Sequence, residues 1–237
     1  MGKGKVKGFK ICISIIFALL ILGAWGYVIW RGEPWDRRYL GYGAIALCFL
    51  FSLIFIGKSS KKIFITFALA TNVAADYFLV FSKDCGTEKY KLIGLCVFLG
   101  VQFFYFLYTL FVQRNNAARA VNFALRAAAI LVVVLILRTR LSLGVKEQLA
   151  IIYIANSVIT LLVMIFHAKT EWVAAIGMFL FILCDVCVGL NEGGFDVLGI
   201  TSGWFYEFIM SHDCAFWFYT PGIFLISLSS VWEKKRD

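Results

Sequence analysis

Long apolar runs alternate with short polar segments along the whole chain. Each run is close to the ~20 residues that an α-helix needs to cross the hydrocarbon core of a bilayer. Only structures that satisfy their own backbone hydrogen bonds can cross that core, which favours helices here. The pattern therefore predicts an all-α, polytopic membrane helical bundle that forms a single domain. We expect about eight transmembrane helices, near residues 9–30, 40–56, 63–81, 92–112, 120–137, 148–166, 172–190 and 215–232.

Two segments depart from the simple alternation. The expected span at 120–137 contains Arg126. An arginine near one end of a span can extend its guanidinium group to the lipid headgroups, so we keep this span and expect that orientation. The segment 197–210 is amphipathic, and we expect it to lie on the membrane surface or to re-enter the membrane.

Composition and charge support a membrane protein. The chain is 62% hydrophobic and 16% charged, whereas soluble domains are about 45–50% apolar and about 25% charged. The net charge of +9 arises mostly from short segments between the apolar runs, where basic residues orient a membrane protein and meet anionic headgroups. The charge therefore does not indicate nucleic-acid binding. Both termini lie on the more basic side of an eight-span protein, so we expect them to be cytoplasmic, with the protein in the cell membrane.

Two aspartates lie within the apolar runs: Asp76 in 70–80 and Asp185 in 179–191. An ionisable residue inside a membrane span is costly, and its presence indicates a functional site. Each aspartate follows the start of its span by ~20 Å of helix. We therefore expect both at similar depth, in the half of the bilayer away from the termini. A duplicated four-helix unit would produce this spacing.

Several other polar residues also occur at otherwise apolar positions of the expected spans. Two buried carboxyl groups close together retain one proton between them, which is the arrangement needed for paired acid–base catalysis. Asn72 shares a helix face with Asp76, Gln102 shares one with Tyr105, and Tyr219 lies in the last span. These residues predict a polar, substrate-binding pocket between helices. The alternative is that they form interhelical hydrogen bonds, worth about 0.6 kcal/mol each, around structural aspartates.

Metal and cofactor chemistry find little support in the sequence. Cys184 and Cys187 have the spacing of a zinc-binding pair, but no second pair or suitably placed histidine completes such a site. The sequence motifs of serine hydrolases, zinc proteases and P-loop proteins are also missing. We expect no metal and no cofactor.

Four segments of the chain resemble the YhhN-like lysoplasmalogenase family of integral membrane proteins. The resemblance covers most of the chain from the third expected span onward, and differs from the family pattern at Ala75, Gln102 and Ile223, where the family usually has Gly, His and Gln. The four segments are Ala-Asp-Tyr-Phe-Leu-Val (75–80), Gln-Phe-Phe-Tyr (102–105), Gly-Met-Phe-Leu-Phe-Ile-Leu-Cys-Asp-Val-Cys-Val-Gly-Leu-Asn (177–191) and Trp-Phe-Tyr-Thr-Pro-Gly-Ile-Phe-Leu-Ile-Ser-Leu-Ser (217–229).

The resemblance implies a hydrolase that cleaves the vinyl ether bond of lysoplasmalogens, releasing a fatty aldehyde and a glycerophospho-alcohol. It implies Asp76 and Asp185 as the acid–base pair, with Tyr105, Asn191 and Tyr219 as supporting site residues. The partner would then be a membrane lipid or lysolipid.

Two other functions remain open: a proton-coupled membrane transporter with the aspartates as relay groups, and a non-catalytic membrane protein with structural aspartates. Against transport, neither aspartate-bearing span contains proline, and the glycines of the second, Gly177 and Gly189, lie nearer its ends. The sequence leaves the oligomeric state open.

Overall fold

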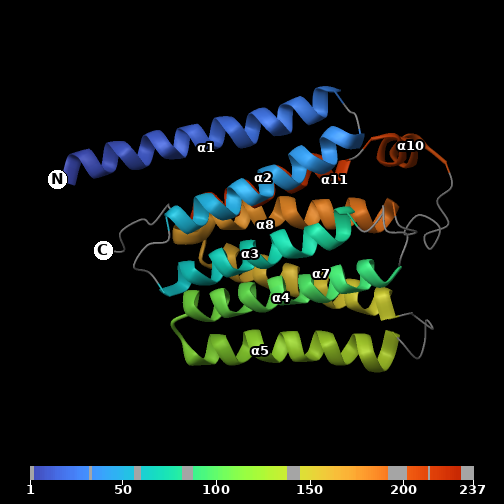
Figure 1. Cartoon of the computed structure of the whole chain (residues 1–237). Helices are drawn as coiled ribbons and strands as arrows, with labels where there is room; N and C mark the ends of the chain where they lie inside the picture. The colour runs from blue at the N-terminus through green and yellow to red at the C-terminus, as the bar shows by residue number, and fades with distance from the viewer. Residues whose placement is uncertain are drawn as a thin grey trace.

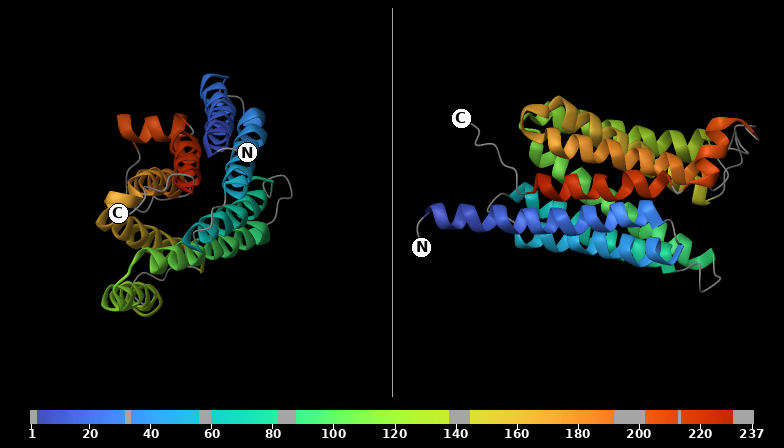
Figure 2. Two further views of the ribbon diagram at one scale, coloured as in Figure 1. Left: turned by 90° about the vertical axis from the view of Figure 1, so that its left-hand side faces the viewer. Right: turned by 90° about the horizontal axis from the view of Figure 1, so that it is seen from above.

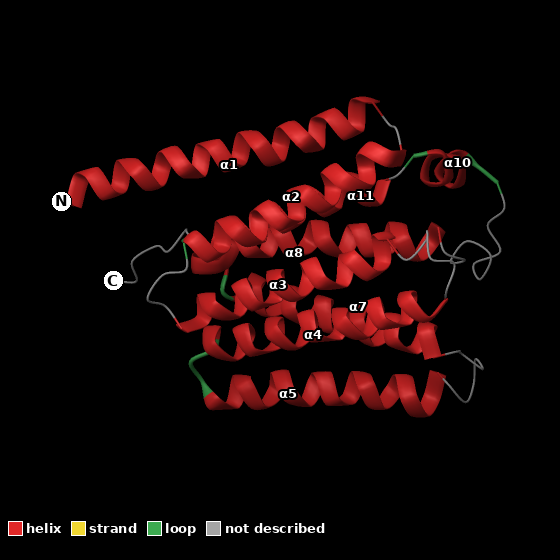
Figure 3. Cartoon of the chain, viewed as in Figure 1, coloured by secondary structure: helices red, strands yellow, loops and turns green. Residues whose placement is uncertain are grey.

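The computed structural model describes residues 3–31, 34–55, 60–81, 88–137, 145–191, 202–212 and 214–230. Within these ranges the chain is helical and contains no strand (Figure 3). The elements are α1 (Lys3–Arg31), α2 (Pro34–Ile54), α3 (Ser60–Phe81), α4 (Glu88–Val112), α5 (Asn116–Leu131), the π-helical turns η2 (Val132–Leu137), α7 (Val145–Phe166), α8 (Ala168–Gly189), α10 (Trp204–Ser211) and α11 (Cys214–Ser229).

Eight of these helices run along a common axis, which agrees with the expected bundle of about eight spans (Figure 1). Among the described residues, six helices are long and apolar enough to cross a membrane: α1, α3, α4, α5 with the start of η2, α7 and α8. The apolar part of α2, from Arg38 to Ile54, and α11 are shorter. Successive helices reverse direction, so α1 begins and α11 ends at the same end of the bundle, the terminal end (Figure 1). The other end is called the far end.

Six helices close a ring, in which α2, α3, α4, α7, α8 and α11 each pack against the next, and α11 packs against α2 again. The end-on view shows this arrangement (Figure 2). α1 lies outside the ring against α2, and α5 lies outside it against α7. The two most closely packed pairs are α3 with α4 and α8 with α11. The ring interior holds the main core, which includes Leu69, Met178 and Ile223.

Small residues allow the close contact between α8 and α11. A Cβ atom on Gly177 would lie 2.8 Å from both the Gly222 carbonyl oxygen and the Ile226 nitrogen. A Cβ atom on Gly222 would lie 3.0 Å from the Gly177 carbonyl oxygen and 3.0 Å from the Phe181 nitrogen. The two backbones are thus in direct contact, as is typical of membrane helices that associate through small residues.

A buried arginine holds α5 against α7, contrary to the expectation that it reaches the headgroups. Arg126 is only 5% exposed and donates to Asn122 (3.0 Å), Asn156 (2.8 Å) and Thr160 (2.9 Å). Its guanidinium carbon also lies 5.1 Å from the centre of the Phe106 ring. The expectation was wrong because α7 offers polar acceptors at the depth of Arg126, so the guanidinium group is satisfied inside the protein.

The helix α10 lies across the far end of the bundle (Figures 1 and 2). Trp204 is 79% exposed, while Ile209 is buried against Cys187 and Cys214. α10 contains residues 204–210 of the segment expected to lie on the membrane surface or to re-enter the membrane, and residues 197–201 of that segment lie outside the described part of the chain. An exposed tryptophan is typical of a helix at the membrane–water interface.

Candidate functional site

A polar cluster lies inside the ring, and five of the six ring helices contribute to it. The two aspartates interact electrostatically with each other and with buried tyrosines of α4, α7 and α11. The contributing residues are Asp76 from α3, Tyr105 from α4, Tyr153 from α7, Asp185 from α8 and Tyr219 from α11.

The two aspartates occupy equivalent places on parallel helices. Asp76 lies five residues before the end of α3, and Asp185 lies four residues before the end of α8. Both helices run from the terminal end to the far end (Figure 1). At 1.5 Å per residue, each carboxyl group is about 6–8 Å of helix from the far end.

Asp76 is enclosed by hydrogen-bond donors from two helices. It is 5% exposed, and its Oδ2 atom accepts from the Tyr219 hydroxyl group of α11. The same oxygen accepts from Asn72 Nδ2 at 3.2 Å, one turn earlier on α3. Asn72 Nδ2 also donates to the Tyr219 oxygen at 2.7 Å. These three side chains therefore form one hydrogen-bonded unit that fixes the Asp76 carboxyl group.

Asp185 has a different environment. Its Oδ2 atom is buried and has no hydrogen-bond partner among the described residues. Tyr153 is the nearest donor to Asp185 and acts on its carboxyl group, although the pair falls short of a complete hydrogen-bond geometry. The Tyr105 hydroxyl group interacts with Asp185 electrostatically and is buried without a hydrogen-bond partner in the described part of the chain. Polar groups thus surround this carboxyl group without saturating it.

Two amide oxygens extend the set of unpartnered atoms. Gln102 Nε2 donates to Ser157 Oγ at 2.9 Å, but its Oε1 atom is buried without a partner, as is Asn72 Oδ1. Because buried polar atoms are nearly always hydrogen-bonded, these unpartnered atoms in the ring interior are unusual, and a bound water molecule or a polar ligand would satisfy them. The atoms are Asn72 Oδ1, Gln102 Oε1, Tyr105 OH, Tyr153 OH and Asp185 Oδ2.

An aromatic wall borders the polar cluster. Phe181, one turn before Asp185 on α8, is fully buried. Its ring stacks on Tyr219 with 5.8 Å between centroids, and lies 6.4 Å from Tyr153 and 6.3 Å from Phe98. The interior of the ring therefore offers polar atoms beside apolar surface, an arrangement that suits an amphiphilic ligand.

Most of the residues singled out from the sequence come together here, with one exception. Asn191 is exposed at the last described turn beyond α8 and does not join the buried cluster. The residues that do gather inside the ring are Asn72, Asp76, Gln102, Tyr105, Asp185 and Tyr219.

Sequence reasoning missed three residues of the cluster. Tyr153 and Ser157 lie four residues apart in an otherwise apolar span, which places them on one helix face and was a usable signal. Phe181 carried no such signal, because it is one of 24 phenylalanines in the chain.

A comparison with known families finds one match that spans most of the chain. The model of the YhhN family matches residues 38–230. The chain belongs to the YhhN family. The matched range of this YhhN-family protein contains the apolar part of α2 and all the other ring helices, whereas α1 lies outside both the match and the ring. No curated protein and no solved structure matches the chain with significant similarity.

Proposed function

We propose that this YhhN-family protein is a membrane hydrolase that cleaves the vinyl ether bond of lysoplasmalogens. The products would be a fatty aldehyde and a glycerophospho-alcohol. The observation that carries the proposal is the pair of carboxyl groups, Asp76 and Asp185, held inside the ring among unpartnered polar atoms. Family membership supports it, because the resemblance at these positions implies the same reaction.

The hydrogen bonds divide the roles between the two aspartates. Two donors, Asn72 and Tyr219, converge on Asp76 Oδ2 and stabilise a carboxylate anion there. Asp185 has Tyr153 alone as a nearby donor, and its Oδ2 atom completes no hydrogen bond with a described residue, so we assign Asp185 as the carboxylic acid. A neutral acid beside a fixed carboxylate is a common arrangement for proton transfer near neutral pH.

The reaction follows from these roles. Asp185 protonates the outer alkene carbon of the vinyl ether, which gives an oxocarbenium ion. The Asp76 carboxylate stabilises this cation and orients a water molecule toward the carbon bonded to oxygen. The water adds its hydroxyl group to that carbon and returns a proton to the carboxylate pair. The resulting hemiacetal breaks its carbon–oxygen bond to give the aldehyde and the alcohol, so one water molecule is consumed.

The position of the cluster suits a single-chain lipid. The aspartates lie about 6–8 Å of helix below the far end, and the vinyl ether bond of a lysolipid lies just below its headgroup. Phe181 provides apolar surface beside the carboxyl groups for the start of the chain. We therefore expect the headgroup to lie toward the far end, with the hydrocarbon chain in the bilayer interior.

The test measures free aldehyde. Purified protein in nanodiscs is given a lysoplasmalogen or an ester-linked lysolipid of the same length, and only the vinyl ether substrate is expected to yield aldehyde. Asp76→Asn and Asp185→Asn are each expected to lower the rate at least about 100-fold, the smaller end of the range for general acid–base groups. The matched control is Glu171→Gln, which changes a buried carboxylate on α8 far from the cluster and should retain aldehyde release.

Two outcomes oppose the proposal. If the wild type releases no more aldehyde than the Asp76→Asn, Asp185→Asn double variant, the protein is not this hydrolase. Uptake of a solute into proteoliposomes that depends on a proton gradient would instead identify a transporter. The structure favours hydrolysis over transport because α3 and α8 are unbroken around the aspartates, whereas many transporters unwind the helices that bind substrate.

A further inference from the structure

A second polar site lies at the terminal end of the bundle. A pocket of about 810 Å³ opens between the α4–α5 turn and the α7–α8 turn. Thr170 and Asp185 are fifteen positions apart on α8, which separates the pocket from the aspartate cluster by about 22 Å. It is therefore distinct from the proposed catalytic site, and the inference below is independent of that function.

The charges that line this pocket are basic. Arg114 and Lys169 are exposed and have no ion pair in the described part of the chain. His167 also lines the pocket, and its Nδ1 atom lies 2.8 Å from the Val163 carbonyl oxygen. Because a carbonyl group only accepts hydrogen bonds, Nδ1 carries the proton, and Nε2 remains for other contacts.

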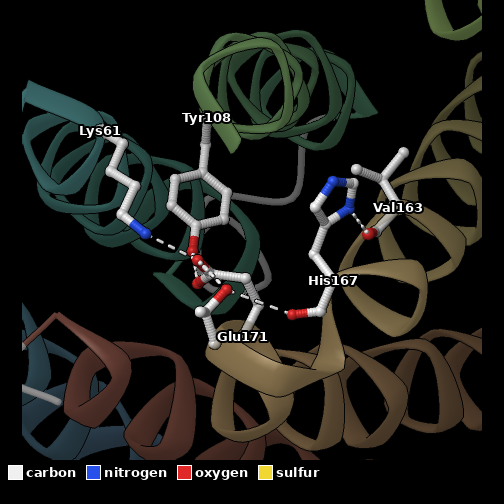
Figure 4. A network of polar contacts seen from close by, with 6 residues as sticks. Lys61, Tyr108, Val163, His167 and Glu171 are labelled. Atoms are coloured by element: carbon white, nitrogen blue, oxygen red, sulfur yellow. Dashed lines mark hydrogen bonds and ion pairs between the residues drawn. The ribbon is translucent and has the colours of Figure 1, made fainter. Parts of the chain in front are cut away.

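The nearby acidic residue does not offset this charge. Glu171 is not part of the pocket lining, and no carboxylate is. Its Oε1 atom accepts from Lys61 Nζ at 2.6 Å and its Oε2 atom from the Tyr108 hydroxyl group (Figure 4). Glu171 is thus neutralised inside the bundle, and the pocket keeps a net positive charge.

An amide donor also faces the pocket. Gln113 is 7% exposed and lines it, and its Oε1 atom accepts from Asn122 Nδ2 at 3.0 Å. The Asn122 Oδ1 atom in turn accepts from Arg126 Nε at 3.0 Å. This chain of hydrogen bonds fixes the orientation of the Gln113 amide. No hydrogen bond from its nitrogen is found in the described part of the chain, and this nitrogen is not among the buried unpartnered atoms, so it reaches the pocket surface with its two N–H bonds available to a ligand.

The starts of two helices add partial positive charge. Both α5 and α8 begin at this pocket, where Ala118 and Ala168 line it. The first N–H groups of a helix lack partners within the helix and favour an anion. At the start of α5 the Asn115 side chain accepts from the Ala117 N–H at 2.9 Å, whereas His167, the residue before α8, makes no side-chain cap. Basic side chains, an amide donor and the uncapped start of α8 therefore converge on one pocket.

We propose that this pocket binds a phosphate group at the edge of the membrane. Phosphate accepts several hydrogen bonds and carries the charge that arginine, lysine and helix starts recognise. The volume lies within the range of small-molecule sites, and basic pockets between membrane helices bind lipid headgroups. The phosphate is carried by an anionic lipid headgroup or is free in solution.

The experiment uses the full chain in nanodiscs and distinguishes these two sources. The first series adds phosphatidic acid to phosphatidylcholine nanodiscs, and the second adds inorganic phosphate to nanodiscs of phosphatidylcholine alone. Native mass spectrometry measures retained phosphatidic acid, and thermal unfolding measures stabilisation by either probe. Binding of phosphatidic acid alone identifies a headgroup site, and stabilisation by both identifies a general phosphate site.

The variants test the residues that define the site. Arg114→Gln with Lys169→Gln should weaken binding at least tenfold, because charge-assisted hydrogen bonds are lost. Arg31→Gln with Lys89→Gln, which removes two exposed charges at the far end, should bind like the wild type. Gln113→Glu keeps the acceptor for Asn122 but replaces the free amide nitrogen with a carboxylate oxygen, and it should also bind at least tenfold more weakly.

The proposal fails if neither probe binds the wild type. It also fails if the Arg114→Gln, Lys169→Gln variant and the Gln113→Glu variant both bind with wild-type affinity. Should the double variant not fold, Gln113→Glu alone decides, because it alters one atom of the side chain without changing its size.

Discussion

At the scale of single residues, two aspartates with the same position on their helices differ in their partners. Asp76 accepts from Asn72 and Tyr219, whereas Asp185 has Tyr153 alone as a nearby donor and its Oδ2 atom completes no hydrogen bond with a described residue. The sequence can place both carboxyl groups at one depth, but the difference in their hydrogen bonds comes from α11, which only the fold brings beside α3. The proposed division into carboxylate and acid rests on this difference.

Tyr219→Phe tests that division. The substitution removes the hydroxyl group that donates to Asp76 and accepts from Asn72, while the ring can still stack on Phe181. With one of two donors lost, the carboxylate should stabilise the cation less well. Aldehyde release should fall about 100-fold, as when one preorganised donor is removed from an active site.

The measurement compares the rate of aldehyde release with the thermal unfolding midpoint. An unchanged rate in a folded Tyr219→Phe protein would contradict the assignment of Asp76 as the stabilising carboxylate. A large loss of stability would show that the hydroxyl group mainly holds α3 to α11.

The sequence could predict the two aspartates of the candidate site but not the hydrogen bonds between distant helices. Asp76 and Asp185 stand out because a carboxyl group within an apolar span is costly. Asn72 and Tyr219 lie 147 residues apart, and no local pattern predicts their hydrogen bond. Arg126 was misjudged for a related reason, since its partners on α7 are 30 and 34 residues away.

At the scale of helices, direct contact between the backbones of two helices holds the site together. Gly177 and Gly222 bring α8 and α11 into backbone contact, and this contact fixes the distance between the helix of Asp185 and that of Tyr219. The apolar pattern predicts that both helices exist. It cannot predict which neighbours they choose, because lipid covers an apolar helix face as well as protein does.

Gly177→Ala should separate these two helices. The added Cβ atom would lie 2.8 Å from two backbone atoms of α11, neither of which can move without the helix. We expect a loss of about 1–3 kcal/mol in the free energy of unfolding, typical of overpacking, together with reduced aldehyde release.

The matched control for this variant is Gly23→Ala on α1, where a Cβ atom meets nothing within 4 Å. The control should be neutral or more stable, since alanine favours helices over glycine by about 1 kcal/mol. Equal unfolding curves for the two variants in detergent would show that the close contact is unimportant.

Arg126→Met tests how α5 is attached. The methionine side chain is similar in length to that of arginine but has no hydrogen-bond donor. Asn122, Asn156 and Thr160 therefore each lose a hydrogen bond. At about 0.6 kcal/mol for each membrane hydrogen bond, the loss should be close to 2 kcal/mol. Hydrogen exchange should rise in α5 and η2 while the ring stays protected. Uniform exchange in all helices would contradict a local role.

At the scale of the whole molecule, the chain divides into two similar halves. In each half a first helix lies outside the ring, α1 against α2 and α5 against α7, and three helices then enter the ring. The closest pairs, α3–α4 and α8–α11, occupy the same place in their halves. This is the arrangement that a duplicated four-helix unit would produce. It also accords with the similar depth of Asp76 and Asp185, which lie near the ends of the third helix of each half.

The orientation of this bundle in the membrane is a separate prediction, and it decides which leaflet can supply each site. The terminal end carries more lysine and arginine than the far end, so we expect it to face the cytoplasm. The phosphate pocket would then face the cytoplasmic leaflet, whose anionic lipids match its charge. The aspartate cluster would be reached from the opposite leaflet.

Reporter fusions measure this orientation. A fluorescent protein fused after Asp237 should fluoresce, and alkaline phosphatase at the same position should be inactive, because each folds on only one side of the membrane. Phosphatase inserted within residues 82–87, which connect α3 to α4 at the far end, should be active. The reverse pattern would place the aspartate cluster on the cytoplasmic side. Its lipid substrate would then enter from the inner leaflet, and the phosphate pocket would meet the outer one.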